Sequence, residues 1–146
     1  RNHVHSIVES GVRDGAEVLS GGKLCEGEGY FYEPTVLSSV RSEMAVVQEE
    51  IFGPVVTAMP FDDPDEVVAL ANDTPYGLAG SIWTRDVSKA HHMAASIRAG
   101  LLWINCHGIP DMAVPFGGYK QSGWERENGW EGLEKYTELK SVLTLL

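Results

Sequence analysis

The sequence holds 146 residues at 16.0 kDa, enough for one domain with a hydrophobic core, because a chain of this length buries about 70% of its unfolded surface. Hydrophobic residues make up 43% and charged residues 22%, close to globular averages, which excludes a disordered or collagen-like chain. Its 11 basic and 21 acidic residues give a net charge of -10, which argues against nucleic acid or an anionic membrane surface as the main partner.

Cysteine usage and the start of the chain bear on the protein's setting. Cys25 and Cys106 lie far apart and form no disulfide framework, so we expect a reducing, cytoplasmic environment. No apolar run reaches about 18 residues, the length that spans a bilayer, and we expect no membrane partner. The chain opens at Arg1 without an initiator methionine or a signal-peptide pattern, so we expect it to be a piece of a longer protein.

The first 40 residues are the least regular part of the sequence. We expect a helix that ends near Val12, a turn at Asp14-Gly15, a short strand over 16–20 and a loop over 25–29. Aromatic and β-branched residues then predict an extended segment over 30–37, broken by a proline.

From residue 54 onward, strand and helix patterns alternate. Asp63 is placed to cap a helix with a proline at its first position, and Asp86 is placed to cap a second helix that Gly100 ends. A continuous apolar run then predicts a strand buried on both faces. The full order is a strand over 54–61, a helix over 63–71, a strand over 78–83, a helix over 87–97 and a strand over 101–104.

This order predicts the α/β class, with a parallel sheet built from βαβ units and helices on its faces. We expect residues 1–134 to form one domain. The last eleven residues, YTELKSVLTLL, place Leu139, Leu143 and Leu145 on one face and polar residues on the other. Residues 135–146 are therefore expected to form a half-buried strand that has no partner within the chain.

Motifs for metal or phosphate binding are missing from the sequence. The five histidines show neither HExxH nor Cys/His ligand spacing, so we expect no metal site. There is no P-loop, and Gly27-x-Gly29 has Tyr32 at the position of the third glycine, so a dinucleotide fingerprint is incomplete.

Cys106 is followed by His107, a pairing that could serve as nucleophile and base. Neighbouring residues on an extended segment point to opposite faces, however, and free cysteines are often buried. We therefore interpret Cys106 as a core thiol and assign no catalytic residue within this chain.

Two further stretches are suited to lining a cleft. A carboxylate at Glu50 beside Phe52 and a glycine turn can hold a sugar hydroxyl while the ring stacks on a heterocycle. From the residues alone, a solvated acid beside a core phenylalanine is the favoured interpretation. Three glycines within 115–123 predict either a loop that lets another segment approach closely or an irregular connector.

Five motifs stand in order over nearly the whole chain: EEIFGPV (49–55), NDTPYGLA (72–79), WIN (103–105), PFGGYKQSG (115–123) and YTELKSV (136–142). Together they resemble the C-terminal part of the NAD(P)-dependent aldehyde dehydrogenase superfamily. The resemblance implies the distal catalytic domain and the final oligomerisation strand of enzymes that oxidise an aldehyde to a carboxylic acid. It also implies NAD or NADP as cofactor, with NAD favoured, and a homo-oligomer, either a dimer or a tetramer.

The resemblance further implies the chemistry of these enzymes. A cysteine thiolate attacks the aldehyde, hydride passes to the nicotinamide, and a glutamate activates the water that hydrolyses the thioester. Both residues are expected upstream of Arg1, as is most of the cofactor domain. The alternative is a non-catalytic α/β interaction module, or a degraded relative, that binds a partner through its terminal strand.

Site residues follow from the same resemblance. Glu50 corresponds to the glutamate that binds the nicotinamide-side ribose hydroxyls and Phe52 to the aromatic residue near the nicotinamide ring, which reverses the interpretation of this stretch as surface acid and core phenylalanine. Phe116 corresponds to a position that lines the aldehyde tunnel. Ile109 and Pro110 occupy the loop where related enzymes place substrate-shaping side chains.

Three other positions are weaker or discordant matches. Glu127 corresponds to an acidic position near the active site that is sometimes proposed in proton relay. Glu125 departs from the family pattern, since a glycine is usual there, often to allow a positive φ. Cys106 does not match the family nucleophile, which agrees with its interpretation as a core thiol.

Overall fold

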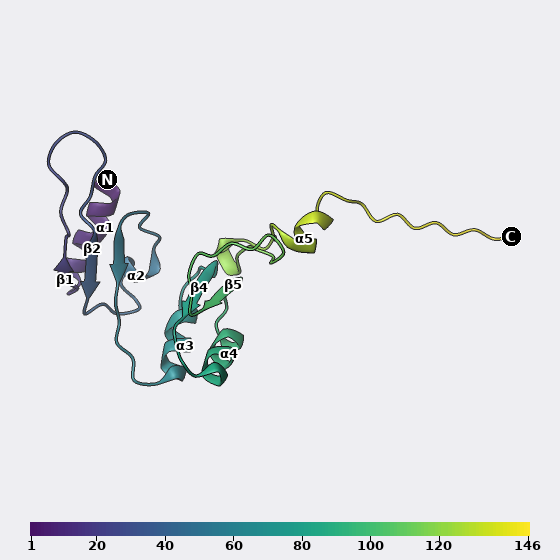
Figure 1. The fold of residues 1–146 in the computed structure, drawn as a ribbon. Coiled ribbons are helices and arrows are strands. Elements are labelled where there is room, and N and C mark those ends of the chain that lie inside the picture. The colour runs from purple at the N-terminus through teal and green to yellow at the C-terminus, as the bar shows by residue number, and fades with distance from the viewer. The chain divides into compact units, whose positions relative to one another are not determined.

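The computed structural model describes residues 1–146, which divide into two compact units, Arg1–Leu70 and Ala71–Leu146. Each unit is described by itself. Figure 1 shows the order of the helices and strands along the chain, and the class is mixed α/β, as predicted. None of the helices has both the length and the apolar character needed to cross a membrane.

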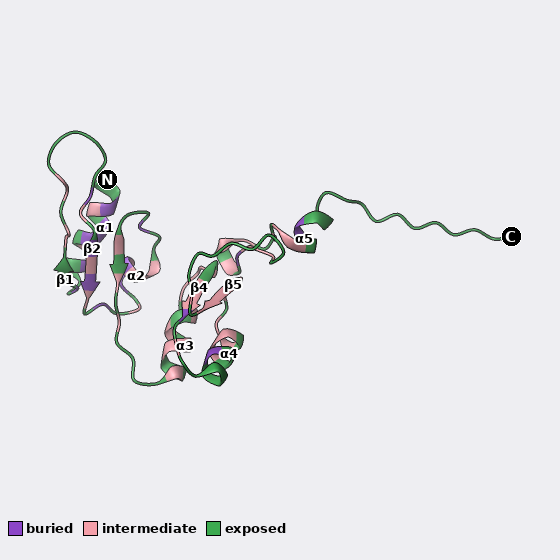
Figure 2. Cartoon of the chain, in the orientation of Figure 1, coloured by how far each residue is buried: buried purple, intermediate pink, exposed green.

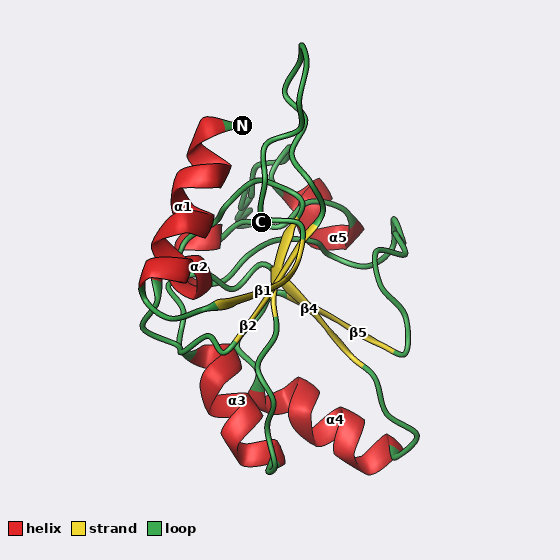
Figure 3. Ribbon diagram, turned by 90° about the vertical axis from the view of Figure 1, so that its left-hand side faces the viewer, coloured by secondary structure: helices red, strands yellow, loops and turns green.

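A small three-stranded sheet organises the first unit. Its middle strand pairs with one neighbour antiparallel and with the other in parallel. Figure 3 separates the helices from the strands by colour. The elements are α1 (Asn2–Arg13), β1 (Glu17–Ser20), β2 (Thr35–Ser38), α2 (Ala45–Gln48) and β3 (Val55–Thr57), with strand order β1-β2-β3.

The core of this unit lies between α1, α2 and the sheet. Val8 is 1% exposed and Leu37 is fully buried, and Figure 2 shows buried residues along α1 and β2. A Cβ at Gly11 would come within 2.5 Å of Val46, so the glycine lets α1 and α2 approach closely. The first unit therefore buries the apolar stripe of α1 together with residues of β2 and α2.

A polar contact also joins α1 to the chain before β2. The Tyr32 hydroxyl lies 3.2 Å from His5 Nδ1, in a largely buried setting. Burial raises the pKa of the Tyr32 phenol, and the carboxylates of Glu9 and Glu33 raise this pKa further. The phenol therefore stays protonated at neutral pH and remains available for a hydrogen bond with the imidazole.

The second unit contains two parallel strands connected by a helix. The strands β4 (Ala79–Ile82) and β5 (Leu101–Ile104) pair in register, and α4 (Val87–Ser96) connects them. Asp86 Oδ1 accepts a hydrogen bond from the Lys89 amide at 3.0 Å, so the helix begins where the sequence predicts. The unit also contains a short 3-10 helix (Lys120–Ser122) and α5 (Gly129–Glu134), while α3 (Pro64–Asn72) crosses the boundary between the units.

Several details differ from the sequence prediction. The strand predicted over 54–61 is only Val55–Thr57 and pairs with β2, while β4 and β5 form a separate two-stranded sheet. β5 was expected to be buried on both faces, yet all four of its residues are half-buried. The reason is that side chains project from the two faces of a sheet, and those of β5 border two cavities instead of being packed on all sides.

The predicted C-terminal strand is also not formed. Beyond α5 the structure assigns no strand, and Figure 1 shows an extended segment up to the C-terminus. Leu139, Leu143 and Leu145 are each at least 98% exposed. A strand needs hydrogen-bond partners for its backbone, and no backbone hydrogen bond joins residues 138–146 to another segment of this chain.

In the second unit, hydrogen bonds join the motif NDTPYGLA (72–79) to the motif PFGGYKQSG (115–123). The Gly77 carbonyl accepts hydrogen bonds from the amides of Gly100 and Tyr119, and the Gly77 amide donates to Ser122 Oγ. A Cβ at Gly77 would lie 2.6 Å from the Arg98 carbonyl oxygen, which explains why a glycine stands at this position.

The side chain of Lys120 makes a second connection between the two motifs. Lys120 Nζ donates to the carbonyls of Asn72 and Thr74, at 2.8 and 3.0 Å. The glycine-rich stretch 115–123 is thus a docked loop rather than a free connector.

We expect Asn72→Ala to destabilise the second unit by about 1–3 kcal/mol, because the Asn72 side chain closes the turn after α4. Its amide nitrogen donates to the Ser96 carbonyl at 3.0 Å, and its oxygen accepts from the Arg98 amide at 2.7 Å. Chemical denaturation of the complete protein measures the loss. Ser88→Ala, at an exposed position of α4, is the control and should change stability by less than about 0.5 kcal/mol. Equal effects of the two substitutions would contradict this role of Asn72.

Candidate functional site

Glu50 and Phe52 lie on either side of a buried residue in the first unit. Ile51 is 9% exposed and belongs to the core, whereas the Glu50 side chain is exposed and Phe52 is 87% exposed. The Glu50 carboxylate has no hydrogen-bond or ion-pair partner among residues 1–146. Both groups are therefore presented outward by a segment whose middle residue is anchored in the core.

The backbone of this segment is unusual. Phe52 has φ +49°, in the left-handed region that residues other than glycine rarely adopt. The next residue, Gly53, packs against α1 so tightly that a Cβ would lie 2.7 Å from Val4. An exposed aromatic ring held in a costly backbone conformation is typical of a functional site rather than of a core position.

The three predicted substrate residues gather in the second unit. Ile109, Pro110 and Phe116 line one cavity of about 550 Å³. Cys106 lines the same cavity as a free, half-buried thiol, so it is not the fully buried core residue that the sequence favours. Most of the other walls are apolar, and the remaining lining residues are Leu101, Leu102, Trp103, Gly108, Asp111, Val114 and Asn128.

Phe116 is held in this cavity by its backbone. Its amide donates to the Glu127 carbonyl at 2.8 Å, and the Glu127 amide donates to the Phe116 carbonyl at 2.7 Å. Glu127 itself is exposed. Within this chain, Glu127 therefore positions Phe116 through main-chain hydrogen bonds and not through the Glu127 carboxylate.

Glu125 does not strain the chain at the position where the family pattern has a glycine. Its φ is not positive, and the nearby residue that does need the left-handed region is Gly123, with φ +119°. The Glu125 carboxylate forms an ion pair with Lys135 at 2.9 Å, between the loop and the residue that follows α5. The substitution thus adds a surface contact.

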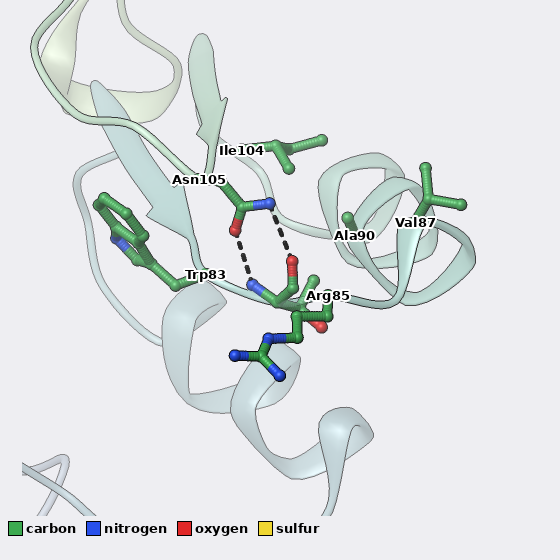
Figure 4. Close-up of a pocket in the computed structure, with 7 residues that line it drawn as sticks. Trp83, Arg85, Val87, Ala90, Ile104 and Asn105 are labelled. Carbon is green, nitrogen blue, oxygen red and sulfur yellow. Dashed lines mark hydrogen bonds between the residues drawn. The ribbon is translucent and has the colours of Figure 1, made fainter.

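The loop that carries Ile109 and Pro110 starts from a side-chain clamp at the end of β5. Asn105 has φ +56°, and its side chain contacts the chain after β4 twice. Its oxygen accepts from the Thr84 amide at 2.9 Å and its nitrogen donates to the Thr84 carbonyl at 2.8 Å. Figure 4 shows both bonds as dashed lines. The side chain thereby fixes the end of β5 beside the end of β4.

A second, more open cavity of about 610 Å³ surrounds this clamp. Its charged lining residue is Arg85, whose guanidinium forms no hydrogen bond or ion pair within residues 1–146. The amides at the start of α4 are no anion site, because the Asp86 carboxylate already caps them. Trp83, Val87, Ala90 and Ile104 complete most of the lining, as Figure 4 shows.

Sequence reasoning missed Trp103, Ser81 and His107 as contributors to the cavity loop. The WIN motif was a signal for Trp103, but the contacts of Ser81 and His107 depend on strand register, which spacing does not reveal. Among residues 1–146, no group of three or more His, Cys, Asp or Glu side chains is arranged to hold a metal ion.

Comparison with known proteins identifies the family. The sequence profile of the aldehyde dehydrogenase family matches residues 1–142. A betaine aldehyde dehydrogenase of Bacillus subtilis is 49% identical over 146 residues, which cover 97% of this chain and 30% of that protein. The chain thus spans about three tenths of such relatives.

Solved structures give the same result. An NAD+ complex of an aldehyde dehydrogenase from Bacillus cereus superposes with a TM-score of 0.93 at 46% identity, over 97% of this chain and 29% of that one. An indole-3-acetaldehyde dehydrogenase mutant of P. syringae, in complex with NAD+ and IAA, superposes with a TM-score of 0.93 at 47% identity, over the same shares of the two chains. The recognition of the family from five sequence motifs is therefore confirmed, and the chain belongs to the aldehyde dehydrogenase family.

Proposed function

We propose that this chain is the C-terminal part of an enzyme that oxidises an aldehyde to a carboxylic acid with NAD(P)+. The observation that carries the proposal is the cavity of the second unit, in which Ile109, Pro110 and Phe116 meet although the phenylalanine belongs to a separate loop. A concave site with mostly apolar walls suits the hydrocarbon part of an aldehyde. The names of the relatives, which are aldehyde dehydrogenases, support the same reaction.

The residues around Ile51 fit a dinucleotide cofactor. Glu50 offers an exposed carboxylate without a partner, and Phe52 offers an exposed ring. A carboxylate can accept hydrogen bonds from two ribose hydroxyls, and an aromatic ring can pack on a flat heterocycle. When bound, NAD(P)+ supplies the acceptor for the hydride. NAD is favoured over NADP because the solved relatives from Bacillus cereus and P. syringae hold NAD+.

Within this reaction the chain's own residues bind and orient. Glu50 and Phe52 hold the nicotinamide end of the cofactor, while Phe116, Ile109 and Pro110 exclude water around the aldehyde tail. The cysteine that forms the thiohemiacetal and thioester, and the base that activates water, come from other segments of the complete protein. No residue here matches either role by resemblance, and Cys106 does not stand at the position of the nucleophile.

We expect the complete protein to reduce NAD+ in the presence of simple aldehydes, and a polypeptide of residues 1–146 to produce no NADH. The physical reason is that this chain holds neither the proposed nucleophile nor most of the cofactor domain. Absorbance of NADH at matched protein concentrations measures both outcomes. Aldehyde-dependent NADH from residues 1–146 alone would refute the assignment of the nucleophile and the activating base to other segments of the protein. A well-folded complete protein that oxidises no aldehyde would refute the proposed function.

A further inference from the structure

A hydrogen bond between two side chains links the sheet of the second unit to the loop that walls the cavity. Ser81 Oγ on β4 lies 2.7 Å from His107 Nδ1, two residues before Ile109. Neither residue lines the cavity itself. The pair can therefore influence the cavity only by holding the loop.

The strand register brings this pair into contact with Trp103. Ser81 stands beside Trp103 in the parallel ladder, so their side chains project from the same face of the sheet. The rings of Trp103 and His107 lie 5.3 Å apart, tilted by 59°. His107 is thus packed on the indole ring and hydrogen-bonded to the serine at the same time.

Trp103 in turn holds the cavity wall. Its indole nitrogen donates a hydrogen bond to the carbonyl of Ile109 at 3.1 Å. Between these tethers lies Gly108, with φ +68°, a position where the backbone is intrinsically free. Since Asn105 fixes only the start of the loop, the contacts of His107 and Trp103 determine where Ile109 and Pro110 stand.

We propose that Ser81 and His107 are positioning residues that set which aldehydes the cavity accepts. This inference rests on the proposed function and names how its substrate wall is held. A short aldehyde makes little contact with that wall, whereas a long aldehyde packs along it. Loosening the loop therefore weakens binding of the long aldehyde and leaves the chemical step unchanged.

The test compares Ser81→Ala with Ser81→Thr in the complete protein, using propanal and octanal as substrates. Ser81→Ala should raise the KM for octanal by about 3- to 10-fold, the effect of one lost hydrogen bond, with kcat and the KM for propanal retained. Ser81→Thr keeps the hydroxyl and should behave as the wild type. His107→Phe keeps a ring on Trp103 but loses the hydrogen bond, so it should reproduce the effect of Ser81→Ala.

A double-mutant cycle sharpens the test, because the two residues act through one contact. The double variant should be no worse with octanal than either single variant. Unchanged selectivity in both single variants, or effects that simply add, would overturn the proposal, as would a parallel loss of thermal stability and of activity with both aldehydes. A wild-type protein that oxidises neither aldehyde would instead refute the proposed function.

Discussion

Glu50→Gln in the complete enzyme is expected to slow hydride transfer by about 10- to 100-fold, because one charged hydrogen bond to the ribose is worth about 1.5–3 kcal/mol. The amide keeps the size of the side chain but has only one acceptor oxygen and no charge. Stability should be unaffected, since the carboxylate is exposed and has no partner in this chain. Single-turnover kinetics at saturating NAD+ and the KM for NAD+ measure the effect.

Glu49→Gln is the matched control for this prediction. Glu49 is adjacent and exposed, so the substitution removes the same charge from the neighbouring position. The Glu49 backbone amide donates to the Ala45 carbonyl and ends α2, and the substitution leaves that bond in place. We expect wild-type kinetics from it within about a factor of two, as for surface substitutions in general. Unchanged single-turnover kinetics in a folded Glu50→Gln protein would remove Glu50 from the cofactor site. Equal slowing by both substitutions would point to a general charge effect.

Elements with strong local signals could be predicted from the sequence. The helix α4 begins at the Asp86 cap, and α3 begins at Pro64 after Asp63, whose Oδ1 accepts from the Asp65 amide at 2.9 Å. These signals lie within a few residues of the helix start, so they act irrespective of the rest of the fold. A second side chain adds to this helix start, because Glu66 Oε2 accepts a hydrogen bond from the Asp62 amide at 3.3 Å.

Strand pairing could not be predicted in the same way. The alternation of strands and helices indicates the class, but it does not show that β3 pairs with β2 or that β4 and β5 form a sheet of their own. Pairing depends on contacts between segments far apart in the sequence. For the same reason, α2, a four-residue helix that Gly11 and Val46 pack against α1, has no clear local signal.

The candidate site could likewise be predicted only in part from the sequence. Resemblance pointed to Ile109, Pro110 and Phe116 one by one, but their meeting in one cavity depends on tertiary contacts. Phe116 reaches the cavity because its backbone pairs with Glu127, and the loop of Ile109 is held by side chains from both strands. The position of Cys106 was predicted less well, since the loop leaves its thiol half-buried on the cavity wall.

The C-terminal segment leads to a prediction about assembly. Leu139, Leu143 and Leu145 share one face of the extended segment and are almost fully exposed, an arrangement that leaves both an apolar face and a strand backbone without partners. We propose that a neighbouring subunit covers this face in the complete protein, which then forms a dimer or a dimer of dimers. Burying each leucine contributes about 1.5–3 kcal/mol, so three of them can stabilise an interface substantially.

Leu143→Asp should therefore shift the complete protein toward the monomer, because a carboxylate without a partner would have to be buried in the interface. Thr144→Asp places the same charge on the opposite face of the same segment, where the alternation predicts contact with solvent, and should leave assembly intact. Light scattering coupled to size-exclusion chromatography measures both variants over a range of protein concentrations. A monomeric wild type, undiminished assembly of Leu143→Asp, or equal dissociation by both substitutions would each show that this segment does not form the interface.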